Sequence, residues 1–301
     1  MQATPECPMK KYKLIINKAA RRGKTRSTIL RTIQAFRKKG VLFDVEYTKG
    51  PKDAGRIAKE ALDDFDVIIA VGGDGTVNEV VQGMVHADKP LGIIPAGTGN
   101  DLIKSLGIPK RISKAIDVIF RGKTNVIDLG RMNETYFANG IGIGLDATVN
   151  METRNVKHCK WGLALYFMAF LRTVRTYSSV HLKIRMNGKT LDRDALLLSV
   201  GNGTTVGGGF RLTPHAKLDD GLLDVTIIDP LPLSALFWHL PKVFTGGICK
   251  TRFTTSETTD HVLLESSQAL PIHIDGEAAY LDEKTYSIAV IPRALTVIGN
   301  F

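Results

Sequence analysis

The sequence has few cysteines and no apolar run long enough to cross a membrane. Its three cysteines, Cys7, Cys159 and Cys249, lie far apart in 301 residues and at no spacing typical of a zinc ligand set. The longest apolar stretch, residues 161–171, falls well short of the roughly 18 residues expected of a membrane span. The apolar run near the N-terminus is also too short for a signal-peptide core. These features argue against a disulfide framework and a structural zinc site, and they predict a cytoplasmic protein.

Acidic residues are scarce in the first fifth of the chain. Residues 1–60 hold 16 lysines and arginines against five acidic residues, whereas the whole chain has 40 against 30 and a formal net charge of +10. Such an excess suits a nucleotide, a nucleic acid or an anionic membrane surface, although a solvated helix face would also produce it. No nucleic-acid-binding motif accompanies the basic segment, so we do not expect nucleic acid as a partner.

The chain divides into two patterns near residue 128. Before that point, short apolar strand patterns alternate with helical patterns, which predicts an α/β domain with a doubly wound parallel sheet over residues 1–128. The expected strands are 14–16, 41–47, 66–71 and 91–94, and the expected helices are 27–39, 53–63, 77–85 and 101–106. Strand patterns between Gly-, Asn- and Asp-rich turns then predict a mostly antiparallel β-sandwich over residues 129–301, interrupted by helices at 160–175 and 233–244.

Two glycine-rich loops each follow a predicted strand and open a predicted helix. Residues 72–76 read Gly-Gly-Asp-Gly-Thr, and residues 95–101 read Pro-Ala-Gly-Thr-Gly-Asn-Asp. Glycine lets the backbone approach a ligand, and a helix N-terminus offers free N–H groups to phosphate. One such loop is weak support, because a tight strand-to-helix turn has the same composition, and residues 72–76 match neither a Walker A loop nor a dinucleotide motif. Two loops at the carboxyl ends of parallel strands predict a phosphate-binding site.

These loops and several later motifs resemble the diacylglycerol kinase catalytic-domain family. The motifs are GGDGTVNEV (72–80), PAGTGNDLIKSLGIP (95–109), NGIGIGLDA (139–147), GNG (201–203), GGG (207–209), PHAKLDDGL (214–222) and DGE (275–277). The first is shared with NAD kinases and 6-phosphofructokinases, whereas GTGND selects the lipid kinases. The resemblance covers nearly the whole chain in the family's order. It implies an NAD-kinase-like N-terminal domain, a β-sandwich C-terminal domain, and last residues that return to the first domain.

The same resemblance implies ATP-dependent transfer of phosphate to a lipid hydroxyl, most simply converting diacylglycerol to phosphatidic acid. The nucleotide contacts carried over are Asn17, Thr48, Gly72, Gly73, Asp74, Gly75, Thr76, Val77, Asn78, Gly97, Thr98, Asn100 and Asp101. Asp74 and Asp101 are the carboxylates expected near the Mg²⁺ that accompanies ATP. One departure concerns the first loop, where the family has Asn-Pro-x-Ser-Gly and this chain has Asn-Lys-Ala-Ala-Arg over residues 17–21.

The resemblance also assigns the catalytic and structural carboxylates. It makes Glu277 the proton acceptor for the lipid hydroxyl, and we take Asp275 of the same turn as a second catalytic candidate. A structural Mg²⁺ is implied at the carbonyl groups of Lys217 and Leu222 and the carboxylate of Asp220, linked through water to Asp128. On the residues alone, both Asp-Gly sequences are equally typical of ordinary hairpin turns.

The segments 161–171 and 231–241 are apolar nearly all round. Such helices are buried or face acyl chains, and burial in the core is our first interpretation. Exposure of Trp161, Phe167 or Trp238 would instead favour a membrane interface, helped by the basic N-terminal region. The expected partners are therefore a lipid substrate and, peripherally, the inner membrane face; bacterial members of the family also pair as homodimers.

Two other functions remain open at this stage. A soluble-substrate kinase of the NAD-kinase type would share the first glycine motif, although GTGND and the apolar helices argue against it. A non-catalytic lipid- or nucleotide-binding regulator would keep the fold and lose the catalytic carboxylates, yet Glu277, Asp74 and Asp220 are all present.

Overall fold

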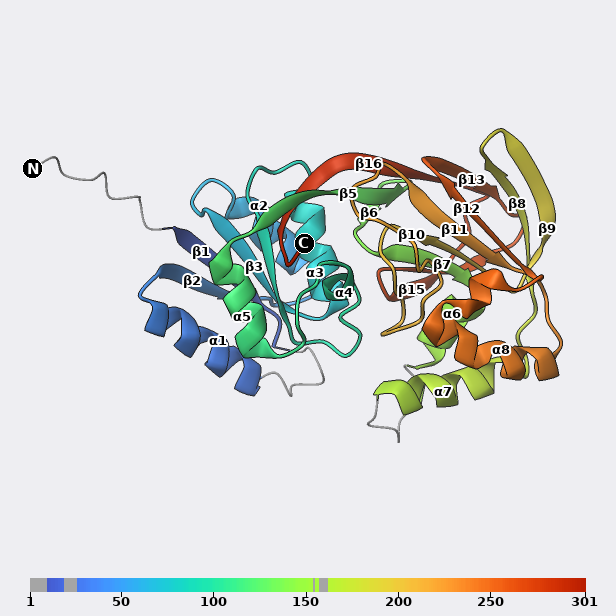
Figure 1. The fold of residues 1–301 in the computed structure, drawn as a ribbon, viewed down its shortest axis with the longest axis horizontal. Coiled ribbons are helices and arrows are strands. Elements are labelled where there is room, and N and C mark those ends of the chain that lie inside the picture. The colour runs from blue at the N-terminus through green and yellow to red at the C-terminus, as the bar shows by residue number, and fades with distance from the viewer. Residues whose placement is uncertain (1–9, 19–25, 154, 157–161) are drawn as a thin grey trace, which may run out of the picture. The chain divides into compact units, whose positions relative to one another are not determined.

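The computed structural model describes all residues except 1–9, 19–25, 154 and 157–161. The chain forms two compact units (Figure 1). Unit 1 comprises Met1–Gly97, Ile108–Asn125 and Leu295–Phe301; unit 2 comprises Thr98–Gly107 and Val126–Ala294. The chain therefore passes from one unit to the other four times, and the pattern change seen near residue 128 falls just after the third of these passages.

Unit 1 is built on a parallel sheet with strand order β2-β1-β3-β4. Its strands are β1 (Lys11–Ile16), β2 (Leu42–Tyr47), β3 (Val67–Gly72) and β4 (Leu91–Pro95). Its helices are α1 (Arg26–Lys39), α2 (Asp53–Glu60), α3 (Asp74–Met84) and α5 (Ile112–Arg121). The strand order reverses direction after β2, and right-handed crossovers then place α1 on one face of the sheet and α2 and α3 on the other.

The core of unit 1 follows from the composition of these elements. Every residue of β3 and β4 is buried, as expected for central strands covered on both faces. On one face α1 and α5 meet through the rings of Phe36 and Phe120, whose centroids lie 4.9 Å apart. On the other face α2 and α3 approach so closely that a Cβ on Gly83 would lie 2.2 Å from the carbonyl oxygen of Gly55. Two small residues at one crossing allow this contact.

Unit 2 contains an antiparallel β-sandwich. One sheet has the strand order β12-β11-β10-β7-β14-β15, and the other contains β16, β13, β8 and β9, with β5 and β6 attached through β16. The strands are β5 (Thr124–Met132), β6 (Thr135–Phe137), β7 (Gly140–Gly144), β8 (Val180–Met186), β9 (Lys189–Ala195), β10 (Leu197–Gly201), β11 (Leu223–Ile228), β12 (Thr254–Thr259), β13 (His261–Glu265), β14 (Leu270–Ile274), β15 (Glu277–Leu281) and β16 (Thr285–Ile298). Buried side chains of both sheets, Tyr286, Ile143 and Leu182 among them, form one core. The α/β unit and the β-sandwich confirm the predicted fold class.

Helices cover one end of the sandwich. They are α6 (Leu145–Glu152), α7 (Gly162–Thr173), α8 (Leu233–Thr245) and the 3₁₀ helix η2 (Gly247–Lys250), while the short α4 (Leu102–Ser105) also belongs to unit 2. α7 and α8 are in contact through the rings of Phe170 and Phe237, at 5.8 Å between centroids. None of the helices in the described part of the chain is both long and apolar enough to cross a bilayer.

The structure differs from the sequence-based elements at several places. α3 begins at Asp74, three residues earlier than expected, because Gly73 is extended and the following turn of Asp-Gly-Thr is already helical. The sequence patterns did not predict α5, α6, β7, β9, β12 or β15. β9 and β12 are short of apolar residues: β9 is mostly solvated, and three residues of β12 are only half-buried. Strands of this kind carry little of the alternating apolar signal on which the prediction depended.

Candidate functional site

The carboxyl ends of the four parallel strands in unit 1 carry most of the predicted nucleotide-binding residues. Asn17 follows β1, Thr48 follows β2, the loop at residues 72 and 73 ends β3, and Gly97 follows β4. Parallel strands place these ends at one edge of the sheet, which is where open α/β folds bind ligands. The structure therefore gathers this part of the predicted set at one edge.

Hydrogen bonds fix this edge. The Asn17 side-chain amide donates to Thr76 Oγ1 at 3.0 Å, and thus ties the loop after β1 to the first turn of α3. The Asn17 backbone N–H donates to Val71 O at 3.2 Å, and Thr48 N–H donates to Ile16 O at 3.0 Å. Thr76 and Asn78 are buried. The predicted polar side chains here hold neighbouring loops in register around the start of α3.

Two glycines allow the loops to approach each other. A Cβ on Gly72 would lie 2.4 Å from the Thr76 side chain, and a Cβ on Gly73 would lie 2.9 Å from the Cα of Gly97. Neither position admits a larger residue without displacing its neighbour. The backbone N–H groups of the first turn of α3, from Asp74 onward, consequently lie beside the loop after β4, and a helix N-terminus of this kind binds phosphate.

The second half of the GTGND loop belongs to unit 2. Thr98, Asn100 and Asp101 lie in the segment Thr98–Gly107, which clusters with that unit. The buried Asp101 carboxylate accepts hydrogen bonds from Lys104 Nζ at 2.5 Å and from Gly208 N–H at 2.7 Å. The sequence motifs GTGND and GGG are thus joined by Asp101 within unit 2. Their nucleotide-binding role stays a prediction.

Asp275 and Gly276 form a two-residue turn between β14 and β15. Both have positive φ, 45° and 87°, and Ile274 pairs with Glu277 across the turn. This is the geometry of a type I′ hairpin, for which Asp-Gly is a favoured sequence. Glu277 occupies the first position of β15 and is exposed.

The carboxylate of Asp275 is buried and bound to backbone. It accepts N–H bonds from Ala138 at 2.9 Å, Asn139 at 3.0 Å and Gly140 at 2.8 Å, the segment that leads into β7. Three backbone donors on one carboxylate tie the hairpin to the segment before β7. The catalytic roles expected of Glu277 and Asp275 stay predictions.

The predicted metal residues lie together in unit 2. Asp128 in β5 binds the turn after Leu218: its N–H donates to Leu218 O at 2.6 Å, and its carboxylate accepts Gly221 N–H at 2.7 Å. The other carboxylate oxygen accepts Arg293 N–H at 2.7 Å. Asp220 is exposed and accepts a bond from Leu222 N–H at 3.2 Å. The turn carrying Lys217, Asp220 and Leu222 is therefore fastened to β5 by Asp128.

The donors at this turn fit a hydrated hard cation better than a closed metal cage. Within the described residues, no group of three or more His, Cys, Asp or Glu side chains could hold a metal ion. Burial, and after it the charge of Asp220, raises the pKa of the nearby Asp224 to about 6, while His215 opposes the shift. The turn offers carboxylate and carbonyl oxygens, which are ligand types that Mg²⁺ takes together with several waters. A metal at this turn stays a prediction.

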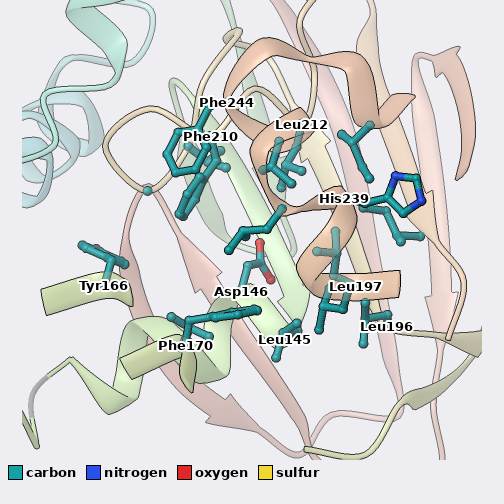
Figure 2. Close-up of a pocket in the computed structure, with 18 of the residues that line it drawn as sticks. Leu145, Asp146, Tyr166, Phe170, Leu196, Leu197, Phe210, Leu212, His239 and Phe244 are labelled. Atoms are coloured by element: carbon teal, nitrogen blue, oxygen red, sulfur yellow. The ribbon is translucent and has the colours of Figure 1, made fainter. Parts of the chain in front are cut away.

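An apolar cavity of about 780 Å³ lies under the helices of unit 2 (Figure 2). Its walls come from α6, α7, α8, the adjoining ends of β10 and β11, and the loop before Leu212. The lining side chains include Val149, Tyr166, Phe170, Leu196, Phe210, Leu236 and Phe244. Cavities of this size and composition take small apolar ligands.

A buried polar pair lies at the wall of the cavity. His273 Nε2 and Asp146 Oδ2 are 3.1 Å apart, and both side chains are nearly inaccessible to solvent. A Cβ on Gly142 would lie 1.9 Å from Asp146 Oδ2, so only glycine leaves room for the pair. Asn150, another lining residue, donates to Gly276 O at 3.0 Å. The polar wall of the cavity is thereby connected to the hairpin that carries Glu277.

Sequence analysis did not assign roles to Asp146, Asn150 or His273. Asp146 lies within the NGIGIGLDA motif, and this position could have marked it as a candidate site residue. His273 lies two residues before the Asp-Gly turn, and the neighbouring sequence contains no motif that would mark it. Their meeting depends on the antiparallel pairing of β14 with β7, a long-range contact that local patterns do not reveal.

Comparisons with known proteins agree with this architecture. The diacylglycerol kinase catalytic domain matches residues 11–132, and the YegS C-terminal NAD kinase beta sandwich-like domain matches residues 139–299. The chain is 30% identical to the diacylglycerol kinase of Bacillus subtilis over 89% of this chain and 90% of that protein. It is 32% identical to the diacylglycerol kinase of Staphylococcus carnosus over 76% of each.

Solved structures show the same fold. A crystal structure of a candidate diacylglycerol kinase from Bacillus anthracis superposes with a TM-score of 0.77 at 27% identity, covering 98% of this chain and 99% of that one. The match extends over both units. The chain therefore belongs to the diacylglycerol kinase family, and its domains are those of kinases that use ATP.

Proposed function

We propose that this protein transfers the γ-phosphate of ATP to the hydroxyl of a membrane lipid, with diacylglycerol as the acceptor and phosphatidic acid as the product. The observation that carries the proposal is the apolar cavity of unit 2, whose wall bears the Asp146–His273 pair and which connects through Asn150 to the Glu277 hairpin. A soluble dinucleotide acceptor has no use for a cavity lined almost wholly by hydrocarbon, whereas an acyl chain does.

Asp146 and His273 are suited to bind the polar end of such a lipid. A carboxylate inside an apolar cavity is costly unless it is paired, and here the His273 imidazole lies 3.1 Å from one oxygen while the Ala147 backbone N–H donates to the other at 2.8 Å. A lipid hydroxyl donating to Asp146 would complete its coordination while the acyl chain replaces solvent among Leu236, Phe210 and Phe170. The polar wall and apolar walls together favour an amphiphile over a polar substrate.

Glu277 is the group we assign to the chemistry. As general base it would accept the proton of the lipid hydroxyl while a bond forms between that oxygen and the γ-phosphorus and the bond to the bridging oxygen breaks, leaving ADP. Asp275 keeps the hairpin in place by binding three backbone N–H groups. Proton acceptance and positioning are thus divided between two carboxylates of one turn.

Mg²⁺ is the metal we assign. One ion would accompany ATP, and a second would bind at the turn of Lys217, Asp220 and Leu222, which Asp128 anchors. For the nucleotide, the N-terminal turn of α3 with Asn17, Thr48 and Thr76 offers N–H groups and hydroxyls at one sheet edge. Bound Mg²⁺ would neutralise phosphate charge, which is its general role in phosphoryl transfer.

The decisive experiment measures transfer from γ-labelled ATP to a panel of lipids in mixed micelles, with NAD as the soluble acceptor. The panel contains diacylglycerol, phosphatidylglycerol, a sphingoid base and ceramide. We expect label in diacylglycerol. Label in another lipid would correct the acceptor and retain the lipid kinase, and label only in NADP would replace the proposal by a soluble-substrate kinase. Absence of label with retained ATP binding would favour a regulator.

A further inference from the structure

Helices α7 and α8 expose large apolar side chains that a soluble domain would normally bury. Trp238 is 77% exposed, Phe167 49% and Phe237 43%, and Met168 and Leu233 are also exposed. No residue of α8 is buried, although most of its 13 residues are apolar. Contiguous exposed apolar side chains of this kind mark an interaction surface. We define these five residues as the α7–α8 face.

The five residues share one surface because the two helices pack together. Phe170 of α7 and Phe237 of α8 are in edge-to-face contact at 5.8 Å between centroids. Phe167 lies one turn before Phe170 on α7, and Leu233 lies one turn before Phe237 on α8, so each extends the contact outward. Figure 1 shows the two helices next to each other below the sandwich. Met168 and Trp238 directly follow Phe167 and Phe237, so all five exposed apolar residues lie on two helices that pack against each other.

The sequence segments that contain this face carry charged residues of one sign only. No acidic residue occurs in the sequence segments 153–191 and 230–256, which contain both helices and their flanks. Arg175, Lys250 and Arg252 are exposed in these segments. The nearest acidic residue before α7 is Glu152, and it forms an ion pair with Arg172 at 2.9 Å. Apolar helices whose own segments carry basic and no acidic residues suit an anionic partner.

The same helices form the wall of the apolar cavity. Phe167 and Phe244 are exposed and also line the cavity, and Phe244 contacts the lining residue Phe210 at 5.1 Å between ring centroids. Phe167 and Phe244 thus lie where the apolar lining of the cavity reaches solvent. An acyl chain that left a bilayer beside the α7–α8 face would remain among apolar side chains on its way to the cavity.

We propose that the α7–α8 face inserts into the interface of an anionic phospholipid bilayer, with Trp238 as its deepest side chain and the basic flanks at the headgroups. Tryptophan prefers the boundary between headgroups and hydrocarbon, and interfacial helices combine such residues with lysine and arginine. This inference rests on the proposed function only for the reason why the protein would bind a bilayer, which is access to a lipid acceptor. Binding to the bilayer itself needs neither ATP nor turnover.

The first test uses vesicles without any acceptor lipid. The chain has two tryptophans, so Trp161→Phe leaves Trp238 as the single tryptophan. We expect its emission to shift to the blue with phosphatidylglycerol–phosphatidylcholine vesicles and much less with phosphatidylcholine alone. Cosedimentation with the anionic vesicles should fall about tenfold or more in Trp238→Glu, because a charge then replaces the inserted ring. Leu30→Glu is the matched control, since Leu30 is exposed on α1 of unit 1 and should not matter.

Several outcomes would overturn this proposal. They are an unchanged emission spectrum, equal sedimentation of Trp238→Glu and the parent, or equal losses in Trp238→Glu and Leu30→Glu. A concentration-dependent dimer that Trp238→Glu dissociates, without vesicle binding, would assign the face to a second copy of the chain.

A separate measurement distinguishes this failure from failure of the kinase proposal. The ratio of the transfer rate on vesicles to that on mixed micelles should fall about tenfold in Trp238→Glu, because micelles deliver lipid without a bilayer. A protein that binds vesicles through Trp238 yet phosphorylates no lipid would keep the docking surface and lose the proposed function. If the parent and Trp238→Glu both phosphorylated lipid equally fast from vesicles and from micelles, the proposed function would stand and the docking surface would be lost.

Discussion

Asp275 and Glu277 are two residues apart, and the hairpin gives them different surroundings. Asp275 points back to the segment before β7 and accepts three backbone N–H bonds, whereas Glu277 is exposed at the start of β15. Asp128 resembles Asp275, because its two carboxylate oxygens also accept backbone N–H groups. The carboxylates of unit 2 therefore include some that fasten loops through backbone N–H groups and others that are exposed, and the sequence alone does not distinguish them.

Glu277→Gln should abolish phosphate transfer while leaving ATP affinity nearly unchanged. The amide keeps the size and hydrogen bonding of the side chain but cannot accept the hydroxyl proton, and loss of a general base costs about 10²–10⁴ in rate. Label transfer to diacylglycerol measures the first effect and nucleotide titration the second. An active Glu277→Gln enzyme would remove Glu277 from the role of base.

Asp275→Ala should destabilise unit 2 before it affects chemistry. It removes the acceptor of three backbone N–H groups, and each group left unpaired costs about 1–3 kcal/mol, so a total of several kcal/mol is expected. Urea unfolding measures the loss. The exposed Asp282→Ala is the control and should change stability by less than about 0.5 kcal/mol. Equal stability of the two variants would show that the Asp275 carboxylate does not support the hairpin.

At the scale of elements, sequence patterns predicted the strands that are apolar along their whole length. β3 and β4, uniformly apolar, were found within two residues of their observed bounds, and the family motifs located the loops that follow them. Burial of the helix at 231–241 was the wrong interpretation, because no residue of α8 is buried. Composition gives the apolarity of a helix but does not tell whether protein or another apolar phase covers it. Trp161, which also bore on this question, lies outside the described residues.

Some residues of α8 line the cavity and others do not, and a pair of substitutions separates the two kinds. Leu236 lines the cavity, whereas Leu233 is exposed and does not. Leu236→Trp should fill part of the cavity and raise the KM for long-chain diacylglycerol in micelles roughly tenfold, equivalent to about 1.4 kcal/mol of lost binding. Leu233→Trp, the same change three residues earlier, should leave that KM near the parental value. Equal KM values for both variants would place the acyl chain elsewhere.

At the scale of the whole molecule, neither unit is one continuous stretch of chain. Unit 1 receives its last segment only after the chain has traversed the β-sandwich, because Leu295–Phe301 returns to it through β16. Val297 pairs with Leu91 of β4, and Gly299 N–H donates to Lys123 O at 3.1 Å. Local patterns cannot predict such a return. The family resemblance predicted this return. Physically, the return makes folding of unit 1 depend on residues 295–301.

Truncation after Ala294 should therefore unfold unit 1 although every predicted nucleotide residue remains in the chain. Leu295, Val297 and Ile298 are almost completely buried, and burial of each contributes about 1.5–3 kcal/mol. Together they approach the whole stability of a typical domain, about 5–15 kcal/mol. We expect loss of ATP binding and rapid proteolysis within residues 10–97. Removal of Phe301 alone, which is exposed, should preserve both properties, since the buried part of β16 remains. If the chain ending at Ala294 still bound ATP with parental affinity, the returning strand would be dispensable for the nucleotide-binding edge.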